Sequence, residues 1–135
     1  MNEFKFSLEP GIKRYENRDY MDQNPIISVV VPFYNSGKYI EQTINSVLNQ
    51  TFPYYEILIV DDGSKDEESL KKLEEVGKLD NRIKVFHKDN EGLAATRDFG
   101  ASKSADTCKY LMFLDDDDLI EPTFLECAYW TLETN

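Results

Sequence analysis

Four short apolar runs, separated by segments with helical periodicity, constrain the fold more than any other feature of this sequence. The runs are IISVVV at 26–31, EILIV at 56–60, IKVFH at 83–87 and YLMFL at 110–114. Such near-continuous, β-branched runs are typical of parallel strands that are buried on both faces. Their alternation with helical segments predicts an α/β fold of the order β-α-β-α-β-α-β-α. We expect a parallel sheet with right-handed crossovers and helices on both faces.

The segments between the runs have the periodicity of amphipathic helices. Apolar residues recur at helical spacing in the first two of them: Ile40, Ile44, Val47 and Leu48, then Leu70, Leu73 and Val76. Ser36 is placed as the N-cap of the first helix, and Asp66 lies near the positive end of the second. We expect a third helix at about 93–104 and a fourth that starts near Pro122, a residue suited to the first helical position.

The composition fits one acidic globular domain, or part of one. The chain has 135 residues, of which 41% are hydrophobic, and 15 Lys and Arg against 26 Asp and Glu give a formal net charge of −11. A single domain typically has about 100–200 residues. Proteins that bind DNA or RNA need a basic surface to displace counterions, so the charge argues against a nucleic-acid partner.

Residues 1–25 differ in character from the rest of the chain. They lack periodicity, so we interpret 1–25 as an N-terminal arm and 26–135 as the folded domain. No apolar stretch reaches the ~20 residues of a spanning helix, and the N-terminus has no apolar signal-peptide core. Cys108 and Cys127 have neither a CxxC spacing nor a partner histidine. Two reduced structural thiols in a cytoplasmic protein are therefore favoured over a disulfide.

Polar residues follow each predicted strand, at the edge of a parallel sheet where ligands bind. In chain order these are Pro32 to Asn35, Asp61 to Ser64, Lys88 to Gly92, and Asp115 to Asp118. Five or six carboxylates are therefore expected to converge on one edge of the sheet. The DDGS segment by itself is also an ordinary turn and helix-cap signal.

The four consecutive aspartates are the least ordinary of these segments. Like charges ~4 Å apart repel by about 4 kcal/mol per pair at an effective dielectric near 20. A solvated acidic loop is one interpretation, but no basic residue follows in sequence to offset the charge. A divalent cation offsets it naturally, and carboxylate ligands select Mg²⁺ or Mn²⁺ over zinc.

The usual signatures of phosphate binding and hydrolysis are missing from the sequence. It contains no GxGxxG, no GxxxxGK[ST] and no GxSxG, and its one histidine, His87, excludes multi-histidine metal sites and catalytic triads. The remaining candidates for ligand binding are an aromatic residue (Tyr34), the acid pair at 61–62, Arg97, and the four aspartates at 115–118. That set could bind a nucleoside diphosphate, with Tyr34 stacked on the base and a metal between the diphosphate and the aspartates.

Three ordered segments resemble the family 2 glycosyltransferases of the GT-A fold. They are ISVVVPFYNSGKYIEQTINSVLNQTFPYYEILIVDDGS, NEGLAATRDFG and YLMFLDDDDLIEP, and the resemblance covers roughly 26–135. It implies a Rossmann-like nucleotide-sugar-binding half and an inverting, metal-dependent transfer from a UDP-sugar to a glycan or cell-surface polysaccharide. By motif, the implied nucleotide-sugar-binding residues are Pro32, Tyr34, Asp62, Asn90, Gly92, Arg97 and Asp116, and the implied metal ligands are Asp115 and Asp117.

Within this set the resemblance implies separate roles. Pro32 and Tyr34 would border the base, Asp62 would accept the uracil N–H, and Asp117 would be the main metal ligand. Gly92 would allow the backbone to approach the donor. The family usually has Asn where this chain has Asp98.

Such enzymes continue for about 80–100 residues more, in the size range of one α/β domain. The chain is therefore expected to be a truncated, donor-binding portion, with the catalytic base beyond Asn135. The expected acceptor is a glycan or lipid-linked molecule. Under this resemblance we also expect peripheral membrane association of the full-length enzyme and homo-oligomerisation. The alternatives are a catalytically silent nucleotide-binding fragment and a Mg²⁺-binding, receiver-like regulatory module, although no acids follow the first strand.

Overall fold

A parallel four-stranded sheet forms the centre of the protein. The computed structural model describes residues 24–134, so all but the last two residues of the arm expected at 1–25 lie outside the described part. The strands are β1 (Ile27–Phe33), β2 (Tyr55–Asp62), β3 (Ile83–Lys88) and β4 (Tyr110–Phe113). Their order in the sheet is β3-β2-β1-β4, and every neighbouring pair is parallel. The predicted α/β architecture and element order are confirmed.

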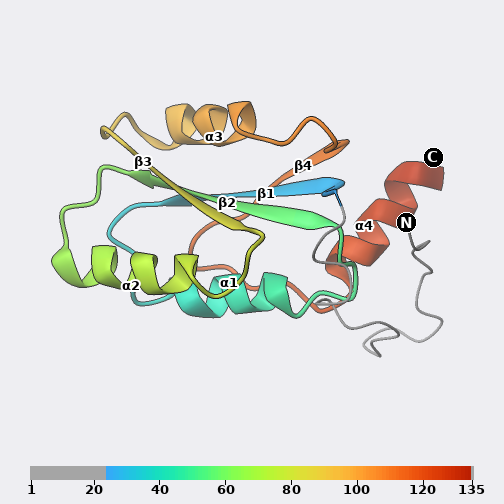
Figure 1. The fold of residues 1–135 in the computed structure, drawn as a ribbon, viewed down its shortest axis with the longest axis horizontal. Helices are drawn as coiled ribbons and strands as arrows, with labels where there is room; N and C mark the ends of the chain where they lie inside the picture. The colour runs from blue at the N-terminus through green and yellow to red at the C-terminus, as the bar shows by residue number, and fades with distance from the viewer. Residues whose placement is uncertain (1–23, 135) are drawn as a thin grey trace.

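Helices cover both faces of this sheet, as expected. In the described part of the chain the helices are α1 (Ile40–Leu48), α2 (Glu67–Gly77), α3 (Leu93–Ser102) and α4 (Phe124–Thr134). Helices α1 and α2 lie on one face and α3 lies on the other (Figure 1). Helix α4 packs near the amino ends of the strands, where the rings of Tyr129 and Phe52 have centroids 4.9 Å apart. No helix within residues 24–134 combines the length and apolar character needed to cross a bilayer.

The predicted N-cap of the first helix is wrong, whereas the fourth helix starts near Pro122 as predicted. Helix α1 begins at Ile40 behind Tyr39, and the Ser36 hydroxyl donates to the carbonyl of Tyr34 instead of capping the helix. Helix α4 begins at Phe124, close to the predicted start, although Pro122 precedes the first helical position instead of occupying it. Asp66, in contrast, caps α2 by accepting from the amide of Ser69 at 3.1 Å.

The core is built from the two central strands, whose residues are all buried. This explains their near-continuous apolar sequence, because helices cover both faces of the sheet. Gly100 of α3 sits directly on the sheet, where a Cβ atom would lie 2.3 Å from Cγ1 of Val30. Helix α3 can therefore approach closely and fix the loop before it. Both Cys108 and Cys127 are free thiols, in agreement with the prediction.

Candidate functional site

The site lies next to β1, where the order in which successive strands are added to the sheet reverses. Helices α1 and α2 lead from β1 to β2 and β3 on one side, and α3 returns the chain to β4 on the other side. Open α/β sheets bind ligands at the carboxyl ends of the strands at such a point. A cleft of about 460 Å³ opens there. Its lining residues are Pro32, Phe33, Tyr34, Asp62, Asn90, Gly92, Leu93, Thr96, Asp115, Asp116 and Asp117.

Eight of the nine predicted site residues line this cleft. The ninth, Arg97, stands beside it, with one guanidinium nitrogen 3.4 Å from a carboxylate oxygen of Asp115 and the group over the ring of Phe113. Phe33, Leu93 and Thr96 also line the cleft and were not predicted. Their signal was weak in the sequence, because an apolar residue or a threonine at a strand or helix end has many ordinary roles.

Asp61 also lies at the carboxyl edge of the sheet, where five or six carboxylates were expected to converge, but its environment differs from that of Asp62. Successive residues of a strand face opposite sides of the sheet, so Asp61 points away from Asp62 and does not line the cleft. Its Oδ2 atom lies 2.8 Å from Nδ1 of His87, and its Oδ1 atom accepts from the amide of Ser64. Alternation along β2 was the signal that separates the two aspartates.

The carboxylate of Asp62 is buried and ties the β3–α3 loop to β2. It accepts from the amides of Glu91 (2.9 Å) and Gly92 (3.1 Å) and lies 3.3 Å from the Lys88 ammonium. Burial raises the pKa of Asp62, but these donors outweigh it and hold the pKa below its ordinary value. Asp62 is therefore ionised at neutral pH, with its carboxylate at the wall of the cleft.

Lys88 was missed by the sequence reasoning. Only 9% of its side chain is exposed, and its ammonium contacts Glu91 at 2.9 Å as well as Asp62. Its position at the end of β3 was visible in the sequence, but its partners lie on another strand and loop. Lys88 balances one acidic residue of the cleft, which leaves the aspartates after β4 as the group with little counter-charge nearby.

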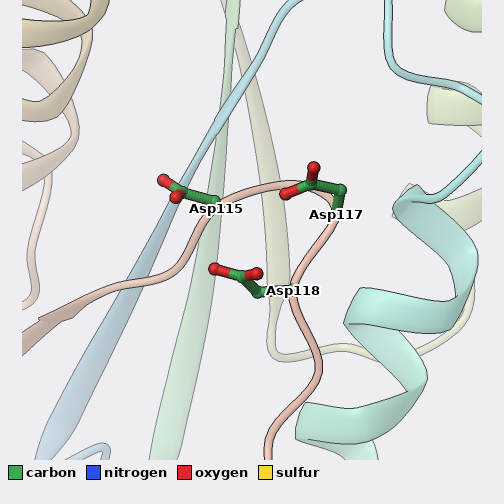
Figure 2. Close-up of side chains that lie close together, drawn as sticks. All are labelled: Asp115, Asp117 and Asp118. Carbon is green, nitrogen blue, oxygen red and sulfur yellow. The ribbon is translucent and has the colours of Figure 1, made fainter.

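A tight turn after β4 gathers three exposed carboxylates. The amide of Asp118 donates to the carbonyl of Asp115 at 3.1 Å, which closes the turn. Asp115, Asp117 and Asp118 then each offer an oxygen, all within 4.8 Å of one another, on the loop that follows β4 (Figure 2). The structure thus brings together the two predicted metal ligands, Asp115 and Asp117, and adds Asp118.

Asp116 differs from its three neighbours in the turn. Its carboxylate accepts from the amide of Tyr34 at 3.4 Å, and its carbonyl accepts from the hydroxyl of Thr43 at 3.0 Å. Burial, followed by the nearby charges of Asp117 and Asp115, raises the pKa of Asp116 above its ordinary value. Asp116 thus links the turn to the loop after β1, where the exposed ring of Tyr34 borders the cleft.

The comparisons with known proteins show the family to which the chain belongs. The family model described as glycosyl transferase family 2 matches residues 28–134. The chain belongs to this family. An uncharacterized glycosyltransferase of Rickettsia conorii is 44% identical over 109 residues, which are 81% of this chain and 17% of that protein. The putative glycosyltransferase EpsH of Bacillus subtilis is 41% identical over 104 residues, 77% of this chain and 29% of EpsH.

Solved structures resemble this family 2 chain in the same region. S. aureus TarS 1–349, in a crystal structure with UDP-GlcNAc, has a TM-score of 0.71 and 31% sequence identity, and the match covers 81% of this chain and 31% of TarS 1–349. A second structure, of TarS 1–349 with UDP, has a TM-score of 0.67 and 29% identity. The chain spans only 14 to 35% of the length of the curated relatives it matches.

Proposed function

We propose that the cleft binds a nucleotide-sugar, a UDP-sugar first of all, as the donor site of a glycosyltransferase. The observation that carries this proposal is the meeting, at one edge of the sheet, of an exposed aromatic ring, a buried ionised carboxylate and an unbalanced acidic turn. The chain's membership of family 2 and the UDP-GlcNAc and UDP bound by the related TarS structures support it.

The proposed roles follow from the chemistry of each group. Tyr34 borders the cleft with 49% of its surface exposed, so its ring is free to stack on a base. Asp62 is ionised and can accept the N–H of a uracil edge beside the two amides that it already holds. Gly92 has a positive φ of 96° and no atom within 4 Å of a would-be Cβ, so it leaves space for the donor.

The acidic turn fits a divalent cation. Three carboxylate oxygens within 4.8 Å of one another match the hard ligands that Mg²⁺ and Mn²⁺ prefer. Asp115 and Asp117 would hold the ion, and Asp118 is placed to help. When bound, such an ion neutralises the diphosphate leaving group as a Lewis acid. Arg97 contacts Asp115 at 3.4 Å and places one positive charge beside the turn.

The proposed reaction is an inverting displacement at the anomeric carbon, with a glycan, polysaccharide or lipid-linked acceptor. A base must take the proton of the acceptor hydroxyl, and none of the described residues is assigned to that role. A cytoplasmic location belongs to the same proposal. A catalytically silent nucleotide-binding protein would share the donor site. The receiver-like alternative is not retained, because the family match and the aromatic end of β1 argue against it.

Isothermal titration with UDP tests the proposal, with and without Mn²⁺. We expect UDP to bind with at least tenfold higher affinity in Mn²⁺, a gain of about 1.4 kcal/mol. Uridine, which lacks the diphosphate, is the control ligand and should show no dependence on Mn²⁺. Failure of UDP to bind at millimolar concentration in Mn²⁺ would sink the proposal.

A further inference from the structure

Asn35 ties the loop that contains Tyr34 to the segment before α2. We call its three hydrogen bonds, with Ser64, Lys65 and Asp66, the Asn35 clasp. The Asn35 amide donates to Oγ of Ser64 at 2.8 Å, and its side-chain Oδ1 accepts from the amides of Lys65 (3.0 Å) and Asp66 (3.1 Å). Among residues 24–134, Asn35 alone of the non-glycine residues has a positive φ, of 51°. Asparagine tolerates this left-handed conformation better than most residues. The backbone turn and the side-chain bonds of Asn35 therefore support each other.

Further contacts hold the loop on both sides of the clasp. Tyr34 is fixed through its own backbone, with Asp116 accepting from its amide and Ser36 donating to its carbonyl. Gly37 donates to the hydroxyl of Ser69 at 3.0 Å, and a Cβ at Gly37 would lie 2.6 Å from the Ser69 Cα. The Tyr34 ring is 49% exposed, so its position depends on these backbone anchors more than on side-chain packing.

The structure assigns Asn35 the role of a positioning residue: it holds the Tyr34 ring where a nucleotide base stacks. This inference rests on the proposed function. Loss of the clasp lets the segment at Tyr34 and Asn35 move in the ligand-free protein. Binding of the base must then order the Tyr34 ring, and the conformational entropy lost in doing so lowers the affinity. The acidic turn touches this segment through the Tyr34 amide and Asp116, but it is closed by its own bond from the Asp118 amide to the Asp115 carbonyl, so we expect it to keep its geometry. The base contribution to affinity should therefore fall, while the diphosphate contribution remains.

Two substitutions at Asn35 separate the side-chain bonds from the backbone conformation. Asn35→Gly keeps access to positive φ but removes Oδ1. Asn35→Asp keeps an acceptor oxygen, which is all that the Lys65 and Asp66 amides require. Ser64→Ala removes the hydroxyl that accepts from the Asn35 amide and leaves the two bonds to Oδ1 in place. Asn81→Gly, at an exposed turn before β3, is the matched control.

Calorimetry with two ligands, UDP and inorganic pyrophosphate, each in Mn²⁺, reports the base contribution as the ratio of their affinities. For Asn35→Gly and Ser64→Ala we expect this ratio to fall about fivefold, part of the full loss of a base–aromatic stack. The ratio should return to within about twofold of wild type in Asn35→Asp and be unchanged in Asn81→Gly. An unchanged ratio in Asn35→Gly, or no rescue by Asn35→Asp, would overturn the positioning role.

Amide hydrogen exchange of the ligand-free protein tests the clasp independently. Exchange at Lys65 and Asp66 should speed up about tenfold in Asn35→Gly and return toward wild type in Asn35→Asp. Unchanged exchange would show that the clasp does not order this loop and would also overturn the inference. If wild-type protein binds no UDP, the proposed function fails instead, so the two failures are distinguishable.

Discussion

The two edges of the sheet treat charged residues in opposite ways. At the amino edge the protein pairs its own charges: the Arg82 guanidinium lies 2.9 Å from both carboxylate oxygens of Asp80 and 4.3 Å from the Tyr55 ring centroid. At the carboxyl edge three exposed aspartates lie close together after β4, with Arg97 3.4 Å from Asp115. Removing one partner of an internal charge pair leaves the other charge uncompensated and destabilises the fold, whereas exposed like charges repel one another and attract a counter-ion. We therefore expect substitutions at the first edge to change stability and substitutions at the second edge to change ligand binding.

Glu56 shows the same internal pairing at the amino edge. This buried carboxylate accepts from the amide of Ala105 at 2.8 Å and lies 3.5 Å from both the Lys84 ammonium and the Cys108 thiol. It thereby holds the loop that returns from α3 to β4. Burial, more than the nearby Glu56 charge, raises the pKa of Cys108 to about 11. The thiol is thus protonated at neutral pH, as expected for a structural cysteine.

The largest effect that we predict lies at the amino edge. Arg82→Ala should lower the free energy of unfolding by about 3 kcal/mol, because it leaves the Asp80 carboxylate without its partner. The affinity for UDP and Mn²⁺ should stay within about twofold of wild type. Urea denaturation and calorimetry measure the two quantities. Lys78→Ala, which removes an exposed ion pair with Glu74, is the control and should change stability by less than about 0.5 kcal/mol. A loss of UDP binding in folded Arg82→Ala would break the distinction between the edges.

Asp62 combines the properties of both edges, since its charge is paired within the protein and its carboxylate also faces the cleft. Asp62→Asn should destabilise the protein by about 2 kcal/mol at pH 7, because an amide NH₂ would face one of the backbone N–H donors. Its pKa is lower in the folded state, so the stabilisation is present above the unfolded pKa and is lost as the pH falls through the folded value. The deficit of the variant should therefore shrink at pH 3 in urea denaturation. Asp106→Asn, at an exposed site, controls for the change of charge. A deficit that is independent of pH would contradict this account of Asp62.

Asp117→Ala tests the carboxyl edge, where we propose that the metal and the ligand bind. Removing one carboxylate relieves repulsion in the turn, so the melting temperature of the metal-free protein should be unchanged or raised. The Mn²⁺-dependent part of the UDP affinity should fall at least tenfold, or about 1.4 kcal/mol. Thermal melts with and without Mn²⁺ and UDP measure both effects, with Asp106→Ala as the control. If metal-free Asp117→Ala unfolds, the acidic turn is structural and the metal assignment is wrong.

The smallest predicted effect concerns Asp116. Its folded pKa is raised, so this group costs stability as the pH rises from its unfolded value through its folded value. Asp116→Asn removes that cost and keeps an oxygen that can accept from the Tyr34 amide. We expect a rise in stability at pH 7 of less than about 1 kcal/mol, measured by urea denaturation. The gain should vanish at pH 3, where Asp116 is protonated in both states; a gain that persists there would show a packing effect instead.

The sequence predicted the sheet and most of the cleft for a physical reason. Buried parallel strands need continuous apolar runs, and the residues that follow such strands must meet at one edge, so Tyr34, Asp62 and the aspartates after β4 could be placed together. Helix starts were harder, because the contacts of Ser36 with Tyr34 are local alternatives to capping. Lys88 and the Asn35 clasp could not be predicted, because their partners come from other strands and loops.

The central claim is that UDP binds at the carboxyl edge of the sheet, and the most direct test is to locate bound UDP by NMR. Amide NMR spectra of the ¹⁵N-labelled protein, titrated with UDP and diamagnetic Mg²⁺, follow both edges at once. We predict shifts at the amides that border the cleft and none at the paired charges of the amino edge. The first group is Tyr34, Glu91, Gly92, Asp115 and Asp117, and the second is Tyr55, Arg82 and Ala105. Shifts centred on the second group, or no shifts at saturating UDP, would contradict the assignment of the carboxyl edge as the donor site.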